Sequence, residues 1–145
     1  MTGRMFFSDT DTGAFFSEFQ VGNLRPDPAP GAYCSAHMGM AVMGINKDLL
    51  VNAWYTGGVD VIDFTDPTSL REIAYYDIAG PGRQGSDNWS AYPYVGPRFR
   101  RGGGTPVYAS DGVGSPDSAR GFVVFRARVE RSGRIFDHLN PQTMD

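Results

Sequence analysis

The residues best suited to chemistry in this sequence are one histidine and a set of aromatic side chains. His37 stands in the stretch CSAHMG, at the entrance of a strand-like run. A neutral imidazole can bind a metal ion or transfer a proton near neutral pH. No second histidine or carboxylate stands beside it at metal-ligand spacing, which favours a hydrogen-bonded structural histidine. We therefore predict no resident cofactor and keep a metal ion held by His37 as the alternative.

Aromatic residues gather in two stretches of the chain and could stack on a sugar or a peptide. The alternative is that they pack between sheets. Asp111 could pair with Arg120 across the base of a long hairpin. The sequence shows no convincing acid–base pair, no G-x-S-x-G motif and no Walker motif. The candidate ligand-binding residues are His37, Trp54, Tyr55, Trp89, Asp111 and Arg120, and His37 is the one weak catalytic candidate.

The acidic stretch DTDTG begins at Asp9 and resembles the start of a calcium-binding loop. An EF-hand loop needs a glutamate at its twelfth position, which here is Gln20. The motif therefore fails, and we expect a polar hairpin turn. Asp63 and Asp66 are likewise expected to hold a turn.

Composition excludes several classes of partner. The 145 residues carry 13 Lys and Arg against 16 Asp and Glu, a net charge of −3, which provides no overall positive field for a nucleic acid. A local basic loop at Arg98, Arg100 and Arg101 is expected to be a solvated hairpin. No apolar run approaches the roughly 18 residues of a membrane span. Cys34 is the only cysteine, so no internal disulfide can form.

Short strand-like segments dominate the chain. They are rich in Val, Ile, Phe and Tyr and are separated by Gly, Pro, Asp and Asn, with 19 glycines and 10 prolines in all. No segment keeps apolar residues at helical spacing over three turns. The sequence predicts an all-β fold.

Three segments resemble one another, and this similarity indicates a repeat. Each has an apolar strand, a glycine and a second strand that ends on phenylalanine; the glycines are Gly13, Gly58 and Gly121. Phe19 and Phe64, which close the first two units, are 45 residues apart. A period near 45 with four strands is typical of a β-propeller blade. The units are MFFSDTDTGAFFSEF, LLVNAWYTGGVDVIDF and PVYASDGVGSPDSARGFVVF.

The middle unit predicts its own turns. Gly57 and Gly58 are expected to turn the chain between two strands, because glycine adopts a positive φ without a Cβ clash. Asp66 and Pro67 would form the next turn. Residues 71–78 would then make the outermost strand, with Arg71 and Glu72 in water. Residues 35–44 and 88–96 are expected to be innermost strands.

The stretch GGVDVIDFTDPTSLREIAYYD, residues 57–77, resembles the repeat of the LVIVD-repeat family, whose core is Gly-V-x-V-x-D-x-(S/T)-D-P. NWSAYPYVG, VYASD and ARGFVVFRAR are similar to the final blade of bacterial members. The resemblance implies a seven-bladed β-propeller, exported or attached to the cell surface, with no general activity established. At about 40–45 residues per blade, this chain would be the C-terminal portion of such a propeller or a shortened relative.

These observations predict a partial β-propeller with about two four-stranded antiparallel blades and part of a third. We expect a two-stranded partial blade at 1–23, a linker at 24–33, a blade at 34–79, a last blade with long inserts at 80–130, and a tail at 131–145. The predicted function is a non-catalytic binding or structural scaffold. Its partners would be the remaining blades or another copy of the chain, with a peptide or carbohydrate ligand. The alternative is a propeller hydrolase or metal-dependent oxidoreductase whose channel-mouth site includes His37.

Overall fold

A computed structural model describes residues 3–21, 34–42, 47–77, 87–94, 105–111 and 121–127 of the chain. Within these ranges all regular structure is β-strand, and no helix occurs. The predicted all-β fold is therefore confirmed for the described residues. The expected linker and tail, and the basic loop at Arg98, Arg100 and Arg101, lie outside them.

The strands form separate antiparallel sheets in which each strand pairs with its neighbours in the sequence. We call these sheets the hairpin, the central sheet and the end sheet. The hairpin contains β1 (Met5–Ser8) and β2 (Phe15–Phe19). The central sheet, in the order β3-β4-β5-β6, contains Ser35–Ala41, Leu49–Tyr55, Gly58–Asp63 and Arg71–Tyr76. The end sheet, in the order β7-β8-β9, contains Ala91–Pro93, Thr105–Asp111 and Gly121–Ala127.

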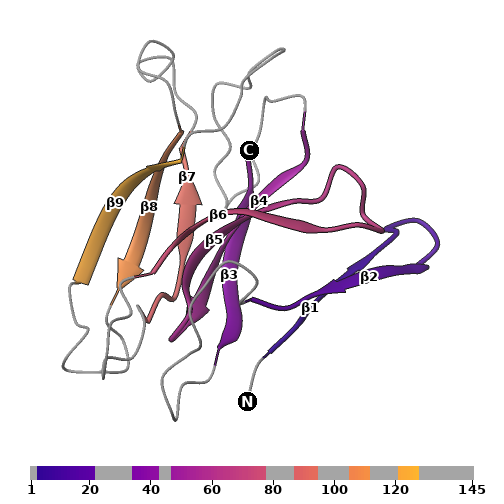
Figure 1. Cartoon of the computed structure of the whole chain (residues 1–145), viewed down its shortest axis with the longest axis horizontal. Helices are drawn as coiled ribbons and strands as arrows, with labels where there is room; N and C mark the ends of the chain where they lie inside the picture. Colours follow the sequence, from indigo (N-terminus) through magenta and orange to yellow (C-terminus); the bar gives the residue numbers. More distant parts are fainter. Residues whose placement is uncertain are drawn as a thin grey trace.

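The central sheet lies between the other two, with the hairpin on one side and the end sheet on the other (Figure 1). Its strands β4 and β5 are almost entirely buried, because apolar side chains project from both faces of these strands and are covered on both sides. Val51, Val59 and Val61 pack against the end sheet at Val107 and Ala109. This contact forms the larger of the two hydrophobic cores found among the described residues.

The opposite face of the central sheet forms the second core. Trp54 and Ile62 point to this face and pack with Phe19 of the hairpin, while Met5 and Phe7 cover its margin. The stack thus has three layers, and the middle layer is covered on both faces. Apolar side chains on both faces of β4 and β5 are thereby removed from water, and this burial stabilises the stack.

The glycine that precedes or begins the second strand of each repeat unit has the same backbone conformation. The φ angles are 72° at Gly13, 71° at Gly58 and 75° at Gly121, all in the left-handed region that disfavours other residues. These values support the predicted similarity of the three hairpins. Gly57 lies in the central turn with Thr56, as predicted. The other positive φ of this turn belongs to Thr56, at 51°, and not to Gly57, so only the positive φ expected at Gly57 is corrected.

The side chains that follow these glycines face the same way in the central and end sheets. In β5 the first and third residues after the glycine, Val59 and Val61, face the end sheet. In β9 the second and fourth residues, Val123 and Phe125, pack back against the central sheet. Because side chains alternate along a strand, Phe122 and Val124 face away from the stack. The central and end sheets therefore present equivalent faces in the same direction.

The turn after β5 has the geometry that the sequence predicts. Asp66 accepts hydrogen bonds from the backbone N of Thr68 at 3.0 Å, and its carbonyl accepts one from the N of Ser69, also at 3.0 Å. Pro67 occupies the second position of this turn, where its fixed φ is suitable. The expected exposure of β6 is only half right. Arg71 is exposed, whereas Glu72 is buried because its side chain lies on the other face of the strand.

Candidate functional site

Three of the predicted site residues meet where the central sheet borders the end sheet. The rings of His37 and Tyr55 lie 4.8 Å apart between centroids, those of His37 and Trp89 5.1 Å, and those of Tyr55 and Trp89 5.7 Å. The Tyr55 ring is edge-on to both partners. We call this group the aromatic cluster. It joins the start of β3, the end of β4 and the segment before β7.

Backbone hydrogen bonds fix the cluster in place. The carbonyl of Trp89 accepts from the backbone N of Met38 at 3.2 Å and from Nδ1 of His37. Met38 also pairs with Ser90 in a parallel bridge, and β3 is irregular between Ala36 and Gly39. The bulge turns His37 toward the end sheet, since extra residues in a strand redirect its side chains.

The hydrogen bond of His37 determines what its ring can offer a ligand. A carbonyl oxygen only accepts, so Nδ1 carries a proton. In the neutral ring Nε2 is then an acceptor. It takes no part in the hydrogen bond to Trp89, and the His37 side chain is exposed. The predicted hydrogen-bonded histidine is present, and its second nitrogen is available to a ligand that donates a proton.

The cluster has an accessible and largely uncharged surface. Trp89 remains 42% exposed although two rings contact it. Met38 is also exposed and accepts a hydrogen bond at Sδ from the hydroxyl of Tyr92 at 2.7 Å. Met38 was not among the predicted site residues, because its place depends on the bulge in β3 and no local motif indicates it. Aromatic faces with a few polar groups suit a neutral, partly apolar ligand.

Buried polar groups beneath the cluster hold the segment that carries Trp89. Asp111 accepts a hydrogen bond from the backbone N of Asp87 at 3.2 Å, and Asp87 accepts one from the N of Thr56 at 3.3 Å. The Ser110 hydroxyl accepts from the backbone N of Trp89 at 3.2 Å. Asp111 is 2% exposed, so its observed contact positions the backbone. Arg120, its predicted partner, lies outside the described residues.

Trp54 is separate from the cluster. Its side chain is 0% exposed and lies 6.2 Å from the ring of Phe19, measured between centroids, in the core beside the hairpin. Tyr55 points the opposite way, as adjacent residues of a strand do. The sequence left two alternatives for the aromatic residues, ligand stacking and packing between sheets. Trp54 packs between sheets, whereas Tyr55 and Trp89 retain access to solvent.

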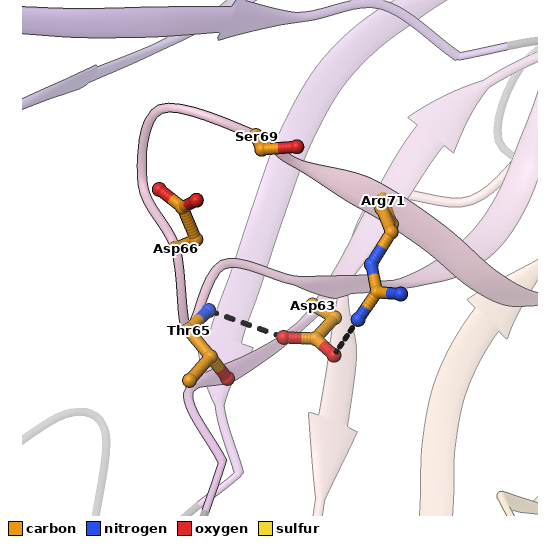
Figure 2. A pocket seen from close by; sticks show the side chains of 5 residues that line it. All are labelled: Asp63, Thr65, Asp66, Ser69 and Arg71. Atoms are coloured by element: carbon orange, nitrogen blue, oxygen red, sulfur yellow. Dashed lines mark hydrogen bonds and ion pairs between the residues drawn. The ribbon is translucent and has the colours of Figure 1, made fainter.

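A hollow lies at the turn between β5 and β6 (Figure 2) and is lined by Asp63, Thr65, Asp66, Ser69 and Arg71. Asp63 accepts a hydrogen bond from the backbone N of Thr65 and pairs with Nη2 of Arg71, both at 3.1 Å. Burial raises the pKa of Asp63, but hydrogen bonds from Thr65 and the charge of Arg71 outweigh it and hold that pKa below its ordinary value. These polar groups stabilise the turn, as the sequence predicts for Asp63 and Asp66.

The lowered pKa of Asp63 predicts a pH dependence of stability. A carboxyl group whose pKa is lower in the folded state stabilises the protein above its unfolded pKa, about 3.9, and this contribution is lost as pH falls through the folded value. We expect Asp63→Asn to unfold with a shallower dependence on pH than the wild type below about pH 5. Urea denaturation at several pH values measures the free energy of unfolding of both proteins. If this free energy falls equally steeply with decreasing pH in both, the lowered pKa of Asp63 is contradicted.

The remaining candidate for an ion is the loop at Asp9. Oδ1 of Asp9 accepts hydrogen bonds from the backbone N of Asp11 at 3.1 Å and from the N and hydroxyl of Thr12 at 2.7 Å each. This is the polar turn that the sequence predicts. Across the described ranges no group of three or more His, Cys, Asp or Glu side chains could hold a metal ion.

Within the part of the chain that the structure describes, no helix has the length and apolar character needed to cross a membrane.

The LVIVD resemblance rests on the sequence motif alone. Comparisons of the chain with protein-family models, with curated proteins and with solved structures find no match.

Proposed function

We propose that this chain is a non-catalytic segment of a β-propeller that serves as a binding scaffold, with the aromatic cluster as its binding surface. The observation that carries the proposal is the stacking of the central sheet, which is covered on one face by the hairpin and on the other by the end sheet. Blades of a propeller bury their apolar faces against the preceding and following blades in this way.

The direction of the strands agrees with such an arrangement. Blades arranged around a common axis are related by rotation, so equivalent strands of neighbouring blades run parallel. The first strand of the central sheet, β3, and the residue just before β7, the first strand of the end sheet, meet in the parallel bridge between Met38 and Ser90. The four strands of the central sheet are joined in simple order, β3-β4-β5-β6, as a propeller blade requires. These are the features on which the propeller proposal rests.

The position and chemistry of the aromatic cluster suggest its ligand. In a propeller the first strands line the central channel, which would place His37 and Trp89 at the channel wall. The rings of Tyr55 and Trp89 can pack against the C–H face of a sugar, and Nε2 of His37 can accept a hydrogen bond from a hydroxyl group. We therefore propose a neutral carbohydrate as the ligand. An exported or cell-surface protein, which the family resemblance implies, would encounter such ligands.

The binding test uses Trp89, the exposed one of the two tryptophans; the other, Trp54, is buried. We expect a neutral oligosaccharide from a panel to change the fluorescence of Trp89, and Trp89→Ala to weaken binding about tenfold or more, the effect of losing roughly 1.4 kcal/mol of stacking. Tyr75→Ala is the control, because Tyr75 is an equally exposed aromatic residue on β6. Isothermal titration calorimetry then gives the affinities.

Each result of this experiment is informative. Trp89-dependent binding without chemical change of the oligosaccharide supports the proposal. Binding of uncharged peptides alone, with the same dependence on Trp89, would overturn the carbohydrate assignment and retain the scaffold. Hydrolysis or oxidation of a bound ligand would overturn the non-catalytic assignment and favour the enzyme with His37 in its site.

A further inference from the structure

The two outermost faces of the stack are apolar and exposed. On the hairpin, Phe6 and Phe15 are each more than half exposed, and their rings lie 6.4 Å apart between centroids. On the end sheet, Phe122 and Val124 are also more than half exposed, and the ring of Phe122 stacks on Tyr108 at 6.0 Å between centroids. Scattered apolar residues on a surface are normal, whereas clusters of them indicate an interaction site.

The outer face of the end sheet is the counterpart of an interface that already exists in the chain. Phe122 and Val124 are the first and third residues after Gly121, as Val59 and Val61 are after Gly58. In the central sheet this face is covered by the next sheet of the stack. In the end sheet the same face is open. What covers it should therefore be the inward face of another sheet of this repeat.

The outer face of the hairpin is the matching surface. A register shift in the hairpin, where the pairing passes from Phe7 with Ser17 to Ser8 with Phe15, turns Phe15 away from the central sheet. Phe15 therefore lies on the outer face with Phe6. Among the described residues, no sheet covers the outer face at either end of the stack.

We propose that copies of this chain associate head to tail, with Phe6 and Phe15 of one copy packed on Tyr108, Phe122 and Val124 of the next. The contact continues the stacking seen between the central and end sheets. Because it joins two different surfaces, it is heterologous and produces a closed ring or an open chain of copies. This inference rests on the sheet stacking and does not require the carbohydrate ligand.

Sedimentation equilibrium of the 145-residue chain tests the association. The wild type is expected to form oligomers whose mass rises with concentration. Phe122→Lys combined with Val124→Lys should abolish them, and Phe6→Lys combined with Phe15→Lys should abolish them equally. All four side chains are exposed, so circular dichroism should show both variants folded. Ile73→Lys is the control, since Ile73 is exposed on β6 and should leave association unchanged.

Mixing the two double variants distinguishes a head-to-tail contact from a symmetric one. Each variant is monomeric alone but retains the surface that the other has lost, so the mixture should form one-to-one pairs and nothing larger. If only the variant with an intact end sheet associates, and it does so with itself, the contact is symmetric and the proposal fails. A wild type that stays monomeric at all concentrations also overturns it. Binding of the monomer to neutral phospholipid vesicles would then assign the apolar faces to a membrane.

Discussion

Gly58→Ala is expected to lower the free energy of unfolding by about 3 kcal/mol or more, among the larger effects that a single methyl group can have. Two causes add. The φ angle of 71° is strained for any residue with a Cβ, which costs about 1–2 kcal/mol. A Cβ at this position would also lie 2.1 Å from the carbonyl oxygen of Tyr76 and 3.1 Å from the Cα of Asp77. Because these are backbone atoms, the end of β6 would have to move away from β5.

Gly13→Ala and Gly121→Ala are matched controls for this prediction. Their φ angles, 72° and 75°, differ from that of Gly58 by only a few degrees, but among the described residues no heavy atom other than those of the adjoining residues lies within 4 Å of the Cβ that each would gain. We expect each to lose only about 1–2 kcal/mol, the backbone strain alone. Urea denaturation of the three variants measures the difference. Equal losses at all three positions would show that the close approach of β6 to Gly58 is wrong.

The comparison between these glycines also shows what the sequence could predict. Local signals identify the hairpins, because a glycine between two short runs of Val, Ile, Phe or Tyr is a strong indication of a turn. The glycines at the equivalent position of the three repeat units, Gly13, Gly58 and Gly121, all have positive φ angles, whereas Gly57 does not. That Gly58 alone of these three is crowded depends on β6, which returns along β5 after the turn at Pro67. Pairing between strands distant in the sequence decides this, and the local pattern does not contain it.

The candidate site was predictable only in part, for the same reason. His37, Tyr55 and Trp89 have the residue types of a binding surface, but the hydrogen bond that joins His37 to Trp89 links residues 52 positions apart. The bulge in β3 and the packing of the end sheet bring them together. Trp54 and Tyr55 are adjacent, so strand geometry predicts that they face opposite ways. Which of the two is covered depends on where the hairpin packs.

The contrast between Trp54 and Trp89 gives the second large prediction. Trp54→Ala is expected to lower the free energy of unfolding by about 3–5 kcal/mol, because it removes a fully buried indole and leaves a cavity between the hairpin and the central sheet. Trp89→Ala removes the same side chain from a position that is 42% exposed, and we expect a loss of about 1 kcal/mol or less. Thermal and urea denaturation of both variants check these values.

Trp54→Phe separates packing from hydrogen bonding at the same site. The indole N–H of Trp54 has no hydrogen-bond partner among the described residues, so phenylalanine removes a polar group that burial disfavours. We expect this variant to lose much less stability than Trp54→Ala. Phe19→Ala combined with Trp54→Ala should lose less than the sum of the single changes, since the two rings are in contact. Additive losses would mean that the hairpin does not pack on Trp54, and the central sheet would then lack the cover on one face that the proposed scaffold requires.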